Sequence, residues 1–190
     1  ATLSKYQLTP GYLYTGGGFE IRKNIDGLLR AYKAWREAAE DVPPLVLSGK
    51  LHSSKNTLAT DVTKLIQELD LAESVKLLGF VPTADLPALY AGAQLFVFPS
   101  LYEGFGMPAL EAMANKTPVI ASGVASLPEV VGDAGTLLDP LDSHLWAEAI
   151  THISQDPEFR KQQSERGFVR AKSFTWESSA RAHVAAYRDA

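Results

Sequence analysis

The chain has 190 residues, of which 46% are hydrophobic and 21% charged, proportions typical of a soluble globular protein with one core. Lys and Arg number 18 against 22 Asp and Glu, and the resulting net charge of −4 disfavours a duplex nucleic-acid binder, so we expect no nucleic-acid partner. The absence of cysteine excludes disulfides and thiolate chemistry and fits a reducing compartment, so we expect a cytoplasmic protein.

No segment suits a membrane span. The best candidate, residues 86–99, is too short and contains Gln94 and two prolines, and no signal peptide is recognisable. Because the chain opens with Ala1 rather than Met, we expect it to be a trimmed part of a longer protein.

Short apolar runs alternate with segments of helical period along the chain. In chain order, we predict a strand at 12–15, a helix at 25–35, a strand at 45–47, a helix at 57–69, a strand at 75–78, a helix at 83–90, a strand at 95–98, a helix at 108–114, a strand at 119–121, helical turns at 126–131, a strand at 136–138, and helices at 145–154, 159–172 and 177–188. This alternation predicts a single Rossmann-like α/β domain, with a parallel sheet of about six strands and helices on both faces.

Three helix starts carry capping patterns. Asp142 is placed to cap the helix at 145–154, and Thr83 and Asp85 are both placed to cap the helix at 83–90. Ser126 with Glu129 three residues later forms a complete capping box for the turns at 126–131. We therefore interpret Ser126 as a cap rather than a ligand-binding hydroxyl.

Ligands of such a sheet bind at the carboxyl ends of its strands, and the loop after the first strand combines glycines with cations there. Gly17 and Gly18 let the backbone approach a ligand closely, and Arg22 and Lys23 then precede the first long helix. Cations beside a helix N-terminus favour a phosphate group, although a flexible turn with two solvated cations explains this loop alone equally well. The loop matches neither a complete dinucleotide fingerprint nor a Walker loop.

The loop after the fourth strand brings together bare amides and two carboxylates. Gly104 and Gly106 remove side chains from the entry to a helix, and Pro108 fits its first turn. Glu103 lies in the loop and Glu111 about one turn into the helix, at ~3.6 residues per turn. A carboxylate at the second position is suited to accept hydroxyl hydrogens from a ribose, and one at the first would lie beside whatever hangs from the phosphates.

Two more features complete the candidate site. Phe80 and Val81, after the third strand, are placed to clamp a flat ring, with a plain turn as the alternative. The four histidines lack partners at metal-ligand spacing, and we find neither a nucleophile elbow nor a clear general base. We therefore expect no metal.

In this order the loops resemble the carboxyl-terminal half of glycosyltransferase family 4 enzymes, which have the GT-B architecture. The segment from Glu103 to Glu111, EGFGMPALE, matches that family's Glu-x7-Glu signature and is quite specific. The supporting matches are RKN at 22–24, LGFV at 78–81, FPS at 98–100, PVIAS at 118–122, LPEVVGDAG at 127–135 and FTWE at 174–177.

The resemblance implies a donor site for a nucleotide-diphosphate sugar. Lys23, with Arg22, would bind the diphosphate, Glu111 the ribose, and Glu103 with the amides of 105–107 the donor sugar. The implied site comprises Gly17, Gly18, Arg22, Lys23, Gly49, Phe80, Val81, Ser100, Glu103, Gly104, Phe105, Gly106, Met107, Leu110 and Glu111, with Glu103 and Lys23 as the catalytic pair and no cofactor. One position departs from the pattern: many members carry an arginine six residues before the phosphate lysine, where this chain has Gly17.

The implied activity is retaining transfer of a hexosyl group, mannosyl favoured and GDP-mannose the expected donor, to a glycan or lipid acceptor. The resemblance assigns residues 1–173 to the donor domain and 174–190 to a helix that packs on an amino-terminal domain absent from this chain. That missing domain would hold the acceptor and any peripheral contact with the inner face of the membrane. We therefore expect the chain to bind nucleotide without transfer and to leave Trp176 or Tyr187 exposed. The alternatives are half of a sugar-nucleotide epimerase and a non-catalytic interaction module of the same fold.

Overall fold

A parallel six-stranded sheet forms the centre of the protein, in a computed structural model that describes residues 1–52 and 57–188. The strands are β1 (Tyr12–Gly16), β2 (Leu45–Ser48), β3 (Val75–Leu77), β4 (Ala93–Phe98), β5 (Val119–Ser122) and β6 (Thr136–Leu138), in the order β3-β2-β1-β4-β5-β6. From β1 the strands are added toward one edge of the sheet as far as β3, and from β4 they are added toward the other edge. Doubly wound folds bind ligands at this switch point between β1 and β4. The predicted fold class is confirmed.

Helices connect these strands. They are α1 (Thr2–Lys5), α2 (Ile25–Ala38), α3 (Val62–Glu68), α4 (Leu86–Gly92), α5 (Met107–Ala114), α6 (Leu127–Val131), α7 (Ser143–Gln155), α8 (Pro157–Ala171) and α9 (Trp176–Arg188), with short 3-10 turns η1 (Ile21–Lys23), η2 (Thr83–Asp85) and η3 (Gly132–Ala134).

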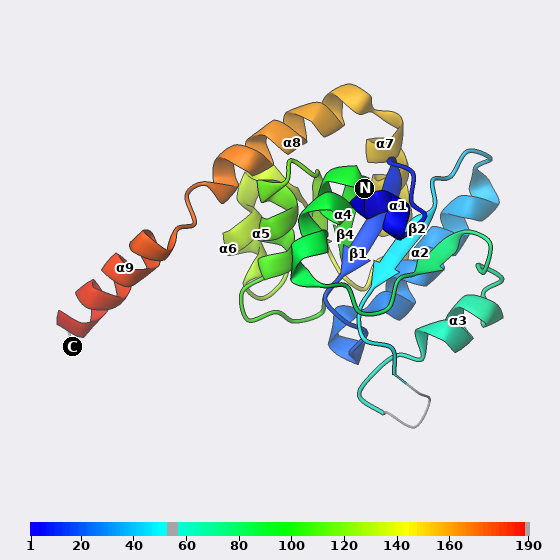
Figure 1. Cartoon of the computed structure of the whole chain (residues 1–190), viewed down its shortest axis with the longest axis horizontal. Helices are drawn as coiled ribbons and strands as arrows, with labels where there is room; N and C mark the ends of the chain where they lie inside the picture. The colour runs from blue at the N-terminus through cyan, green and yellow to red at the C-terminus, as the bar shows by residue number, and fades with distance from the viewer. Residues whose placement is uncertain (53–56, 189–190) are drawn as a thin grey trace.

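The sheet is covered on both faces (Figure 1). Alternate strand residues point to opposite faces, so Leu45 and Leu47 join the cluster under α2, α3 and α7, whereas Val46 joins the cluster under α1, α4, α5 and α6. The central strand β4 is therefore apolar from Leu95 to Phe98, where both of its faces are buried.

One predicted helix begins later in the structure. The helix expected at 57–69 begins only at Val62, where Asp61 caps it by accepting from the Lys64 amide. The preceding residues instead pair with the first loop, since the Ile21 amide donates to the Leu58 carbonyl (3.0 Å) and the Thr60 amide donates to the Phe19 carbonyl (2.8 Å). Backbone pairing with a distant segment thus overrides the local helical period.

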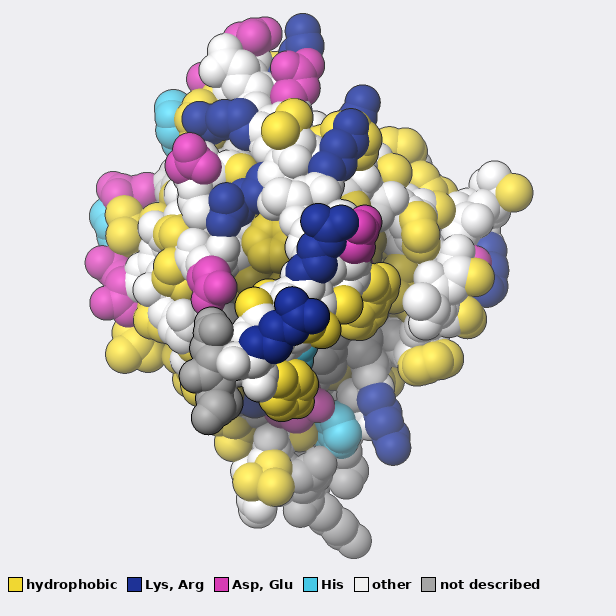
Figure 2. Space-filling model, turned by 90° about the vertical axis from the view of Figure 1, so that its left-hand side faces the viewer, with side chains coloured by type: hydrophobic (Ala, Val, Ile, Leu, Met, Phe, Trp, Pro, Cys, Tyr) yellow, Lys and Arg dark blue, Asp and Glu magenta, His cyan; other side chains and the backbone are white. Residues whose placement is uncertain are grey.

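The carboxyl-terminal helices leave the layered body. α8 crosses over α5, and α9 projects away from the sheet and its covering helices (Figure 1). None of the residues of α9 is buried, and Trp176 and Tyr187 are 89% and 80% exposed. Figure 2 views the end of the molecule that carries α9 and shows hydrophobic side chains exposed among Lys and Arg. None of the described helices is long and apolar enough to cross a membrane.

Candidate donor site

The glycine-rich first loop folds closely over its neighbours. Gly17 and Gly18 have φ angles of +101° and +108°, which favour glycine. A Cβ atom on Gly17 would lie 3.4 Å from both the Lys23 Nζ and the Pro108 Cγ, so this turn packs against the start of α5. A Cβ atom on Gly49, after β2, would lie 2.8 Å from the Gly18 Cα, so two strand ends meet here without side chains between them.

The two cations of the first loop converge on one carboxylate of the fourth loop. Lys23 Nζ lies 2.6 Å from Glu103 Oε1, and Arg22 Nη1 lies 3.1 Å from Glu103 Oε2. Lys23 and Glu103 are both buried, whereas the Arg22 side chain is half exposed. Lys23 Nζ also stands 5.0 Å from the centre of the Phe98 ring. The structure thus brings together residues 80 positions apart, as the sequence predicts for two strand carboxyl ends.

A tyrosine that the sequence analysis did not identify holds the second carboxylate. The Tyr90 hydroxyl, on α4, donates to Glu111 Oε2 at 2.9 Å. Burial, together with the nearby Glu111 charge, raises the pKa of Tyr90 far above its usual range, so this hydroxyl keeps its proton and remains a donor. Glu111 is itself half-buried on α5, and Tyr90 fixes its direction.

Helix α5 begins with no side-chain cap. Gly106 stands before it with a φ of +106°, and a Cβ atom there would lie 2.6 Å from Leu127 Cδ2. Glycine is therefore required at this position for both conformation and space. Pro108 has no amide hydrogen and the Ala109 amide donates to the Gly106 carbonyl at 3.0 Å. The Met107 amide, at the start of the helix, has no earlier helical turn to accept it, which makes this end suitable for an anion.

Ser126 does not cap α6, so the capping-box prediction is wrong. Its hydroxyl lies 2.9 Å from the carbonyl oxygens of both Glu103 and Phe105. The local pattern is complete, but the hydroxyl donates instead to these two carbonyls, which belong to the loop of residues 99–106 after β4, called the donor loop below. Nearby, the buried hydroxyls of Ser100 and Ser122, at the ends of β4 and β5, have no hydrogen-bond partner within residues 1–52 and 57–188.

The loop expected to meet the base presents one open and one buried side chain. Phe80 is 78% exposed, whereas Val81 belongs to the core. Neither Thr83 nor Asp85 caps α4 through its side chain, contrary to prediction. Asp85 instead accepts from Lys5 Nζ and the Tyr6 hydroxyl, both at 2.6 Å.

The remaining predicted residues, in the loop after β4 and on α5, differ in exposure. Gly104, Phe105 and Met107 are exposed and Leu110 is half-buried. A Cβ atom on Gly104 would meet no atom within 4 Å, so the space around this position is open.

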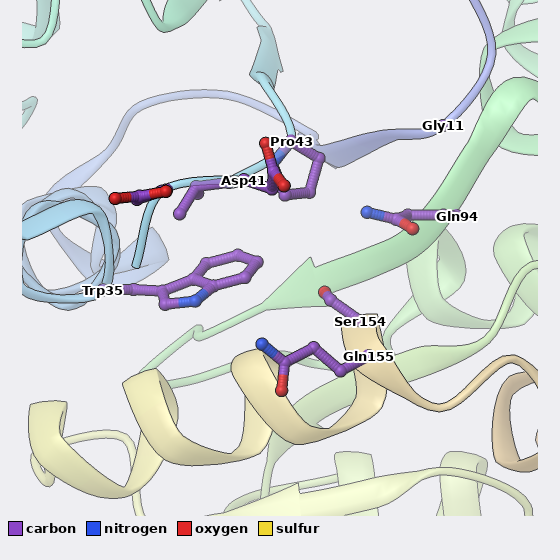
Figure 3. A pocket seen from close by; sticks show the side chains of 9 residues that line it. Gly11, Trp35, Asp41, Pro43, Gln94, Ser154 and Gln155 are labelled. Carbon is purple, nitrogen blue, oxygen red and sulfur yellow. The ribbon is translucent and has the colours of Figure 1, made fainter. Parts of the chain in front are cut away.

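A hollow of about 390 Å³ lies elsewhere, at the amino ends of the strands (Figure 3). Trp35, Asp41, Gln94 and Ser154 line it, with Glu40 beside them and no Lys or Arg. An acidic lining without cations does not suit a diphosphate, so this hollow is not the donor site. No group of three or more metal-ligating His, Asp or Glu occurs in the part of the chain that the structure describes.

Comparison with known proteins gives a consistent result. Residues 6–170 match the family model described as "Glycosyl transferases group 1". The O-antigen chain mannosyltransferase B of Escherichia coli is 43% identical over 187 residues, which cover 98% of this chain and 48% of that protein. The MMP alpha-(1->4)-mannosyltransferase of Mycolicibacterium hassiacum is 38% identical over 131 residues, covering 67% of this chain and 32% of that protein.

Among solved structures, sucrose-phosphate synthase from Thermosynechococcus elongatus superposes with a TM-score of 0.82 and 31% identity, over 99% of this chain and 48% of that one. The chain thus spans about half the length of this structure and of the Escherichia coli mannosyltransferase.

Proposed function

Because the chain belongs to the group 1 glycosyl transferases, as its motifs predict, we propose that it is the donor-binding half of a retaining hexosyltransferase. The donor is a nucleotide-diphosphate sugar, with GDP-mannose favoured because two similar proteins are named mannosyltransferases. The acceptor is a glycan or a lipid held by an amino-terminal half, and the 190 residues alone bind donor without transferring it.

The convergence of Lys23, Arg22 and Glu103 at the carboxyl ends of β1 and β4 carries this proposal. In the proposed reaction an acceptor hydroxyl forms a bond to the anomeric carbon while the bond between that carbon and the diphosphate breaks. Negative charge builds on the leaving diphosphate, which takes up the hydroxyl proton. Lys23, Arg22 and the Met107 amide at the start of α5 stabilise that charge. No general base is assigned.

The other groups orient the donor. Glu111, held by Tyr90, accepts hydrogen bonds from the two ribose hydroxyls. The exposed Phe80, together with the backbone of Val81, contacts the base. Glu103 and the amides at 105–107 contact the sugar. The proposed site uses no metal, so EDTA should leave nucleotide affinity unchanged.

Titration calorimetry of this chain against GDP, UDP and ADP and their sugars tests the proposal. Lys23→Met and Glu111→Gln should each weaken binding of the preferred nucleotide by about tenfold or more, since each removes a charge-assisted contact of ~1.5–3 kcal/mol. Lys64→Met and Glu68→Gln are matched controls, because these two residues form an exposed pair on α3. They should leave affinity unchanged.

Two results would contradict the proposal. Unaltered affinity in both site variants, with folding intact, would remove the assignment of the residues. The absence of heat with every nucleotide would favour the interaction module instead.

A further inference from the structure

The connector between α8 and α9 touches the donor loop. The ring of Phe174 packs edge-on against the ring of Phe105, with centroids 5.9 Å apart and an interplanar angle of 84°. Phe105 is flanked by Gly104 and Gly106, neither of which has a side chain to anchor the loop. Phe174 therefore supports this loop from a segment about 70 residues further along the chain, because edge-on aromatic pairs are favourable.

Phe174 is itself held in place by Arg170. The Arg170 guanidinium lies over its ring, 5.6 Å from the centroid. The same guanidinium donates to the carbonyl oxygens of Val130, at 2.6 Å, and Glu129, at the carboxyl end of α6. A Cβ atom on Gly132 would lie 2.7 Å from Arg170 Cζ, so this packing leaves no space for a side chain there.

The other end of α6 returns to the donor loop. Ser126 shares its hydroxyl hydrogen between the carbonyls of Glu103 and Phe105, and Leu127 packs against Gly106. The contacts thus form a closed ring: donor loop, Phe174, Arg170, α6, Ser126 and back to the donor loop. Figure 1 shows how α6 and α5 lie beside the end of α8, where the connector begins.

We propose that Phe174 is a positioning residue for the donor sugar. It fixes Phe105 and, through it, the loop amide at this position that contacts the sugar, whereas the phosphate and ribose groups are held by residues it does not touch. This inference rests on the proposed function and deepens it, because it assigns recognition of the sugar, rather than of the nucleotide, to a residue outside the Glu-x7-Glu segment.

The experiment compares the affinities of GDP-mannose and GDP for the same chain by calorimetry. Phe174→Leu keeps apolar volume but removes the ring, and it should weaken GDP-mannose about threefold to tenfold while leaving GDP unchanged. Phe174→Tyr keeps the ring and should restore the wild-type ratio. Val169→Ala, an exposed position on α8, is the control and should change neither affinity.

The outcomes separate the two proposals. The positioning role is wrong, while the donor site stands, if Phe174→Leu leaves the ratio of the GDP-mannose and GDP affinities at its wild-type value, whether or not both affinities fall. It is also wrong if the wild-type chain binds GDP-mannose no more tightly than GDP. If the wild-type chain binds neither ligand nor any other pair of the panel, the proposed function fails and the positioning role fails with it.

Discussion

Glu103 is the residue that joins the charges of the site. Its one carboxylate pairs with a buried ammonium and a half-exposed guanidinium, so both cations are held in position before any ligand arrives and the three groups keep a net positive charge. The same carboxylate would oppose an incoming diphosphate. A residue that orients the cations therefore also reduces their attraction for an anion.

Glu103→Gln should separate these two effects. The amide keeps an acceptor oxygen but loses the charge, so GDP should bind about tenfold more tightly, which a Coulomb gain of roughly 1.4 kcal/mol would supply. The free energy of unfolding should fall by about 3 kcal/mol, because Lys23 becomes a buried charge without a counter-ion. Calorimetry and urea denaturation measure the two quantities.

Glu148→Gln is the matched control for this variant. Glu148 is exposed on α7, where it lies beside the likewise exposed His144, so loss of its charge should alter neither quantity. Weaker GDP binding in Glu103→Gln than in the wild type would contradict the charge argument.

At this scale the sequence identifies the residues of the first and fourth loops but not their supports. Lys23 and Glu111 stand in recognisable patterns next to helix starts. Tyr90 is an apolar-period residue of α4 whose hydroxyl gains a role only because α4 and α5 pack together. Ser126 has a complete local pattern, and only the folded chain shows that two distant carbonyls take its hydroxyl.

Among the elements, α1 is fixed to the body by one charged cluster. Asp85, in η2, accepts hydrogen bonds from Lys5 and Tyr6. The bond from Lys5, followed by the bond from Tyr6, lowers the pKa of the Asp85 carboxyl. A carboxyl whose pKa is lower in the folded chain adds stability above its unfolded pKa and loses it as the pH falls through its folded pKa. The cluster should therefore be intact near pH 7 and weaken below about pH 4.

The NMR signals of the Tyr6 ring should report this change. In the wild type they should move as the pH falls from about 5 to about 2.5, with a midpoint below the usual Asp value of ~3.9. Asp85→Asn should remove the transition, whereas Asp26→Asn, which alters an exposed pair on α2, should retain it. A transition that persists unchanged in Asp85→Asn would show that another group titrates.

Helices and strands with a clear period are predicted within a few residues, and the errors lie where distant segments meet. α3 starts late because residues 58–60 pair with the first loop, and α1 has too short an apolar pattern to be found without the α4 surface it covers. A one-dimensional pattern contains the faces of an element but not its partners.

For the whole molecule, strand alternation predicts a parallel sheet, and the rule that ligands bind at strand carboxyl ends points to the edge where Lys23 and Glu103 meet. The order of the strands, which places β1 beside β4 and thereby Lys23 beside Glu103, follows from three-dimensional packing. The hollow beside Trp35 lies at the amino ends of the strands, whereas the sequence motifs lie at the carboxyl ends, so its position could not be predicted from the motifs.

α9 should be the least protected helix of this chain. α9 has 13 residues and no buried side chain, and isolated helices of ~12–15 residues or fewer are only marginally stable in water. Its amides should exchange hydrogen at nearly the rate of an unfolded peptide, whereas those of the packed helix α2 should be strongly protected. Comparable protection in the two helices would contradict this expectation.

The exposure of α9 has a consequence for reconstitution. If an amino-terminal half covers its aromatic side chains, as the family resemblance implies, then joining the halves supplies the packing that this helix lacks. Far-ultraviolet circular dichroism of an equimolar mixture should then exceed the sum of the separate spectra at 222 nm, a wavelength ordinarily used for helix. The excess signal at this wavelength would thus measure how much of the two halves has assembled, without substrate and without a label.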